Sequence, residues 1–137
     1  MDTDLGLIVT DAAADVYDEL GGGLSECIYQ NALSIALRAR GCAVETEVVV
    51  PVFYKEAYVG FVRPDILVNR QVVLELKAVV KITESHLLQT RGYLRWLPSP
   101  PPNYSRRLTQ SCMRGAVLNF GAEELEIRPV VNPFIEA

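Results

Sequence analysis

Two carboxylates and a lysine are spaced so that they could act together on a phosphate. Asp65 follows Pro64, and Glu75 and Lys77 stand on either side of one apolar residue further along the chain. Side chains two apart on a strand share a face, so Glu75 and Lys77 point the same way if this segment is a strand. Neighbouring carboxylates repel, and burial makes their charges costlier. A hard divalent cation relieves both effects and accepts phosphate oxygens. The pattern therefore indicates metal-dependent phosphodiester chemistry.

A simpler interpretation of the same three residues remains open at this point. Glu75 and Lys77 could form an ion pair on the surface of a sheet, and Asp65 could be a turn residue. Short patterns of an acidic residue, any residue and a lysine are common by chance. The two interpretations differ in where they place Glu75, which is buried in the first and exposed in the second.

Polar residues on two helical segments could add to this constellation. Glu26 and Tyr29 lie three apart on one predicted helix, at the edge of its apolar face. Alternatively, Glu26 is a first-turn glutamate favoured by the helix dipole. His86, Gln89 and Tyr93 share a face of a later helix. Gln89 and Tyr93 could contact substrate or hold a ligand, or be ordinary residues at the edge of the core. His86 is the only histidine, and a structural role is favoured for it over that of a general base.

Periodicity predicts an α/β fold with a mixed sheet, in which two helices precede three strands, one helix and two strands. Helices are expected over about 4–20, 25–40, with Ser25 as the cap, and 84–97. Strands are expected over about 43–50, 58–68, 71–78, 113–120 and 125–131. Asn69-Arg70 is typical of a tight turn, which predicts an antiparallel pairing of the strands around it.

Composition is that of one globular domain over residues 1–137. Half of the residues are hydrophobic, and the formal net charge is -4. An acidic chain is unusual for a nucleic-acid binder, although an acidic metal site itself contributes negative charge. Cys27, Cys42 and Cys112 lack CxxC spacing, and one histidine makes a zinc site improbable. With no signal peptide or membrane-spanning run, we expect an intracellular protein, cytoplasmic or nuclear, rather than a secreted one.

Several of these segments resemble known nuclease motifs. Residues 23–29 (GLSECIY) form the signature of the GxxExxY family, which resembles the PD-(D/E)XK nuclease superfamily. Arg63-Pro64-Asp65 looks like its first acidic motif, and residues 75–78 (ELKA) look like its second. Residues 86–89 with 93–94 look like its helix motif, similar to the Q-x-x-x-Y motif of nucleases attached to recombination helicases. The resemblance runs from about residue 5 to 120 and depends on the combination of motifs in order.

This resemblance implies a restriction-endonuclease-like core and a division of roles among the site residues. Asp65, Glu75 and the Leu76 carbonyl would bind Mg²⁺ or Mn²⁺, and Lys77 would be the catalytic lysine. Glu26 would be the acidic residue of the leading helix, bonded to a water on the metal or to the lysine. Gln89, Tyr93 and His86 would contact the substrate or the metal shell. The implied reaction is hydrolysis of DNA phosphodiester bonds, in repair, recombination or processing.

The chain departs from the family pattern in a proline-rich insertion over residues 98–110. It could be a tolerated surface loop, or a contact for nucleic acid or a partner through Arg106 and Arg107. The apolar residues 132–135 could dock on a neighbouring copy. Two other functions stay open. One is a nuclease-fold assembly or interaction protein acting in a homo-oligomer or larger complex. The other is action on RNA, for which the sequence shows no stacking platform.

Overall fold

The computed structural model describes residues 2–97 and 114–132, with the side chains of residues 5–97 and 114–132. The predicted insertion over residues 98–110, including the paired arginines, lies entirely outside these residues. The chain begins with two helices, α1 (Asp2–Leu20) and α2 (Glu26–Ala39), close to their predicted bounds. None of the described helices has the length and apolar character that crossing a bilayer requires.

A five-stranded sheet forms the centre of the fold, in the order β1-β4-β5-β6-β7. Its strands are β1 (Val44–Thr46), β4 (Ile66–Val68), β5 (Val72–Lys77), β6 (Arg114–Phe120) and β7 (Leu125–Val130). The β5–β6 pairing is parallel and the other three are antiparallel, so the sheet is mixed. The helix α3 (Glu84–Trp96) lies between β5 and β6 in the sequence. The α/β class and the antiparallel pairing across Asn69-Arg70 are confirmed.

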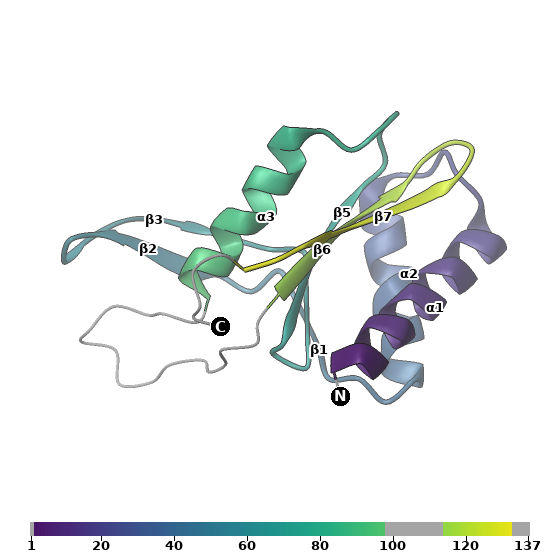
Figure 1. Ribbon diagram of the computed structural model, residues 1–137, viewed down its shortest axis with the longest axis horizontal. Helices are drawn as coiled ribbons and strands as arrows, with labels where there is room; N and C mark the ends of the chain where they lie inside the picture. The colour runs from purple at the N-terminus through teal and green to yellow at the C-terminus, as the bar shows by residue number, and fades with distance from the viewer. Residues whose placement is uncertain (1, 98–113, 133–137) are drawn as a thin grey trace.

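Two of the predicted strands are each divided in the structure. The first is interrupted at Glu47, whose backbone has a positive φ of 52°, so β1 ends before β2 (Val50–Tyr54) begins. The second, predicted over residues 58–68, is divided into β3 (Ala57–Val62) and β4, and Pro64 lies between the two. Proline has no N–H group that could donate a hydrogen bond to a neighbouring strand. As a result β2 and β3 pair with each other as a separate antiparallel hairpin outside the main sheet (Figure 1).

Helices cover the sheet from both sides, with α1 and α2 on one face and α3 on the other (Figure 1). β5 contributes to both cores because its side chains alternate. Leu74 and Leu76 pack in the core shared with α1 and α2, whereas Val73 packs in the core under α3. Each fully buried leucine contributes roughly 2 kcal/mol of hydrophobic stabilisation. Consequently Glu75, between the two leucines, must point toward the α3 side.

The glycine loop between α1 and α2 fixes where α2 begins. A Cβ on Gly22 would lie 2.4 Å from the carbonyl oxygen of Gly121, so no larger residue fits this close approach. Gly23 has a φ of 95°, a conformation that favours glycine. The hydroxyl of Tyr29 donates to the Gly21 carbonyl at 2.6 Å and accepts from the Leu24 N–H at 3.2 Å. The tyrosine of the predicted signature therefore closes this loop.

Candidate active site

Asp65 lies where the chain enters the main sheet. It immediately precedes β4, whose Ile66 is paired with Leu74 of β5. The Oδ2 atom of Asp65 accepts a hydrogen bond of 2.8 Å from the Leu76 N–H. This bond holds the Asp65 carboxylate against β5, at the residue between Glu75 and Lys77. The predicted meeting of the two motifs is therefore present in the fold.

Glu75 and Lys77 form an ion pair in the interior rather than on the surface. The Lys77 Nζ lies 3.3 Å from Glu75 Oε2, and the two side chains are 16% and 7% exposed. Lys77 Nζ also donates to Gln89 Oε1 on α3 at 3.2 Å. The simpler interpretation of an exposed pair is wrong, because β5 is a central strand and α3 covers this face.

Burial is the main electrostatic influence at the site. Burial and, after it, the charge of the nearby Asp65 raise the pKa of Glu75 to about 7, against the opposing effects of Lys77 and the Tyr93 hydroxyl. Burial also raises the pKa of Asp65, while the hydrogen bond from Leu76 lowers it. The pKa of the Tyr93 hydroxyl is raised by burial and by the carboxylate of Glu75. The structure therefore brings five of the predicted residues together: Asp65, Glu75, Lys77, Gln89 and Tyr93.

Glu26 reaches the same region from the opposite face of the sheet. It is the first residue of α2, with Ser25 at the N-cap position but without a capping bond from the serine side chain. Its Oε2 accepts a hydrogen bond of 3.2 Å from the Ala78 N–H, directly after Lys77. Its charge also raises the pKa of Asp65. Glu26 thus lies at the end of β5, near the predicted site.

Among the predicted contact residues, His86 has a visible structural task. Its Nδ1 accepts a hydrogen bond of 3.0 Å from the Thr83 N–H as part of a capping box that begins α3. This bond satisfies a backbone donor that a helix start leaves without an intrahelical partner. A substrate contact by His86 stays a prediction.

Sequence reasoning missed two residues that hold the chain beyond Lys77. Asn119 is buried on β6; its Oδ1 accepts from the Val79 N–H at 2.9 Å, and its Nδ2 donates to the Val79 carbonyl at 3.0 Å. Glu126 on β7 accepts from the Ile82 N–H at 3.3 Å. A polar residue inside the apolar run of β6 was the available signal for Asn119, since such residues are seldom buried without a partner.

Glu47 is another acidic residue beside the site that the sequence did not single out. Its N–H donates to the Asp65 carbonyl at 3.0 Å, and its charge raises the pKa of Asp65. The Oε2 of Glu47 lies 3.5 Å from Gln30 Nε2 on α2. The partly polar face of the predicted strand over 43–50 was its only signal.

The oxygen atoms at the site suit a hard divalent cation. Glu75 Oε1 is buried and has no hydrogen-bond partner among the described residues, and a buried carboxylate in that state is unfavourable. The carboxylates of Asp65 and Glu75 lie near enough to influence one another. Over the side chains of residues 5–97 and 114–132, no group of three His, Cys, Asp or Glu side chains forms a ready-made metal cluster. Two carboxylates and a backbone carbonyl are a different donor set from such a cluster.

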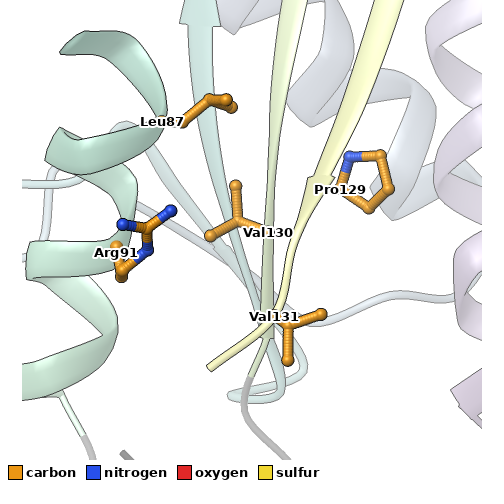
Figure 2. A pocket seen from close by; sticks show the side chains of 5 residues that line it. All are labelled: Leu87, Arg91, Pro129, Val130 and Val131. Atoms are coloured by element: carbon orange, nitrogen blue, oxygen red, sulfur yellow. The ribbon is translucent and has the colours of Figure 1, made fainter. Parts of the chain in front are cut away.

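A groove of about 450 Å³ lies elsewhere, between α3 and the end of β7. Figure 2 shows its lining side chains, which are Leu87, Arg91, Pro129, Val130 and Val131. None of these is a predicted site residue. The charged constellation at the end of β5 and this groove are therefore separate features.

Comparison with known proteins places this chain in a family. No curated protein matches the chain. A solved structure titled "Crystal structure of SSO0001" is similar, with a TM-score of 0.56 and 18% sequence identity over 78% of this chain. At this low identity the likeness concerns the fold alone, and this chain spans 50% of the length of that one. The family model of the PD-(D/E)XK nuclease superfamily, whose members typically use divalent metals, matches residues 3–130. The chain belongs to the PD-(D/E)XK nuclease superfamily.

Proposed function

We propose that this protein is a metal-dependent deoxyribonuclease that hydrolyses DNA phosphodiester bonds inside the cell, within the GxxExxY branch of its superfamily. The observation that supports this most directly is the buried Glu75 beside the partly buried Asp65, in which Glu75 Oε1 lacks a partner among the described residues. A fold does not retain such an arrangement for stability, because ionised Glu75 is unfavourable where it lies. A ligand that compensates the two carboxylates gives it a purpose.

The cation would be held by the carboxylates of Asp65 and Glu75 and the carbonyl of Leu76. Bound there, Mg²⁺ or Mn²⁺ would supply positive charge to the oxygens of a scissile phosphate. The hydrogen bond from the Leu76 N–H orients Asp65 before any ligand arrives. Since the pKa of Glu75 is about 7, its carboxyl group is about half protonated near neutral pH and must release that proton to bind a cation.

Lys77 would stabilise the negative charge that develops on the phosphate. Its ammonium group is held on two sides, by Glu75 Oε2 and by Gln89 Oε1. A lysine fixed in this way loses little conformational entropy when it contacts the phosphate, so the entropic cost of reaching the transition state is small. Gln89 positions Lys77, the Tyr93 hydroxyl supports Glu75, and Glu26 holds the chain at Ala78 next to the lysine.

Cleavage of linear and circular DNA, single- and double-stranded, tests this proposal directly. The purified chain should cleave with Mg²⁺ or Mn²⁺ and not with EDTA. Lys77→Met and Asp65→Asn should each lower the rate by a factor of about 100 or more. Lys81→Met, at an exposed lysine just beyond β5, is the matched control and should cleave like the wild type. Wild-type protein inert on every DNA, or a Lys77→Met variant as fast as wild type, would refute the assignment.

Cation binding offers a readout that does not depend on cleavage. Mg²⁺ should raise the melting temperature of the wild type and leave that of Asp65→Asn nearly unchanged, because only a protein that binds the ion is stabilised by it. The apparent affinity should increase as pH rises toward 7, since the proton on Glu75 competes with the ion. An equal response of both proteins would show that the ion binds elsewhere.

A further inference from the structure

The β2–β3 hairpin extends beyond α3, away from the main sheet (Figure 1). Only its base belongs to the core, where Val50 is buried and Val62 packs against it. Large apolar side chains on the rest are exposed: Tyr54 by 65%, Tyr58 by 59%, Val59 by 60% and Phe61 by 52%. Burial of a large aromatic side chain is strongly stabilising, so a group of exposed rings indicates a surface that binds a partner.

Two of the exposed rings, those of Tyr54 and Tyr58, have neighbours within the hairpin itself. The rings of Phe53 and Tyr58 meet edge to face across the two strands, with centroids 5.9 Å apart and planes at 74°. Lys55 Nζ lies 5.3 Å from the centre of the Tyr54 ring. Nothing lies within 4 Å of the position that a Cβ would take on Gly60, so the backbone between Val59 and Phe61 is open to a flat ligand.

The hairpin also leads directly into the site. β3 ends at Val62, and only Arg63 and Pro64 separate it from Asp65. Over residues 50–63 the charged side chains are Lys55, Arg63 and Glu56, two positive and one negative, which gives a net charge of +1. The whole chain carries -4. The aromatic hairpin is therefore a locally positive part of an acidic protein, which complements a polyanion that also offers flat faces.

We propose that the hairpin binds single-stranded DNA, stacking bases on Tyr58 and Phe61 of one face and on Tyr54 of the other face near the turn, and directing the strand toward Asp65. This inference rests on the proposed nuclease function and specifies its substrate. Aromatic stacking is independent of base sequence, because every base has a flat face. It also gives an acidic chain a source of affinity that phosphate neutralisation alone does not supply.

Fluorescence anisotropy of a labelled oligothymidine in EDTA tests the binding without cleavage. Replacing Tyr54 or Tyr58 by alanine should each weaken binding at least about fivefold, the usual loss for one stacked base. The corresponding phenylalanine variants keep the rings and should bind like the wild type. Ile35→Ala removes an equally exposed apolar side chain from α2 (69% exposed) and is the control for a general loss of surface. Unchanged thermal melting of each variant confirms folding.

Salt dependence and competing ligands sharpen the test. With Lys55 and Arg63 as the phosphate contacts, log K should fall against log salt with a slope of about -1.4, and Lys55→Gln should reduce the slope to about -0.7. Duplex DNA should bind more weakly than the single strand. Preference for duplex, or for oligouridine over oligothymidine, overturns the assignment. So does a tyrosine-to-alanine variant that binds normally but no longer self-associates in sedimentation, which would make the hairpin a contact between copies.

The test of single-strand binding by the hairpin and the test of the nuclease function can fail independently of each other. Lys77→Met should lose cleavage yet still bind single strands through the hairpin rings, because Lys77 lies off the hairpin. Normal binding by both tyrosine-to-alanine variants, together with metal-dependent cleavage by the wild type, refutes the inference and leaves the nuclease assignment standing. Ring-dependent binding without any cleavage refutes the nuclease assignment and leaves the hairpin as a single-strand binding element.

Discussion

Replacement of Glu75 by glutamine should stabilise the protein when no divalent cation is present. The pKa of Glu75 is raised from 4.5 to about 7, so the folded state holds this proton more tightly than the unfolded state. The free energy of unfolding of the wild type should therefore fall as pH rises from about 4.5 to 7, and should remain at the lower value above pH 7. A shift of this size corresponds to roughly 3 kcal/mol.

Glutamine keeps the shape of glutamate but has no charge to lose, so its buried side chain escapes this penalty. At pH 8 with EDTA, Glu75→Gln should unfold with a free energy roughly 1–3 kcal/mol higher than the wild type. At pH 5 the two proteins should be nearly equal. Urea denaturation at both pH values measures the difference, and the comparison between the proteins removes the contributions of other titrating groups.

Saturating Mg²⁺ should reverse the order, because the wild type gains binding free energy and the variant lacks a ligand for the ion. Glu45→Gln is the matched control. Glu45 pairs with Arg70 at 3.1 Å on the surface, and its replacement should change stability by less than about 1 kcal/mol at either pH. The reasoning fails if Glu75→Gln is destabilised equally at pH 5 and pH 8, or if the stability difference does not depend on pH.

Three other substitutions, with Gly92→Ala as a comparison, test the elements that position the site. Tyr29→Phe should lower the free energy of unfolding by about 1–3 kcal/mol, because two backbone groups of the glycine loop lose their partner while the ring remains; chemical denaturation measures it, and an unchanged stability would contradict this role. Gly22→Ala should destabilise by about 2 kcal/mol or more through overlap with the neighbouring backbone. Gly92→Ala, in an exposed turn of α3 with open space around it, should instead stabilise by about 0.5–1 kcal/mol, and thermal melting distinguishes the two signs. Asn119→Ala should cost about 2–3 kcal/mol and slow DNA cleavage, because Val79 loses both hydrogen bonds; normal cleavage by the folded variant would show that this loop does not position the lysine.

Much of the site was predictable because its residues are near each other in sequence. Alternation along β5 places Glu75 and Lys77 on one face, and the turn at Asn69-Arg70 returns the chain so that Asp65 meets Leu76. Period and turn chemistry are local properties that a sequence displays directly. Burial of the ion pair was not local information, since it depends on α3 covering the strand.

What the sequence did not reveal depends on distant partners. Asn119 meets Val79 across 40 positions, and Glu126 meets Ile82 across 44, so neither shows a spacing that could be recognised. Separation of the β2–β3 hairpin depends on one unusual backbone angle at Glu47 and one missing donor at Pro64. Runs rich in valine favour a continuous strand, but the backbone conformation of Glu47 and the missing N–H group of Pro64 interrupt these runs.

The differing sequence separations of the site's hydrogen bonds have a consequence for folding kinetics. Asp65 and Leu76 are 11 positions apart, whereas Glu26 meets Ala78 across 52. Short loops close with less loss of entropy, so the β4–β5 turn can form early, before α3 and the distant elements dock. Glu75 is then still hydrated when the transition state is crossed. Raising the pH from 5 to 8 should therefore accelerate unfolding while leaving the folding rate nearly unchanged.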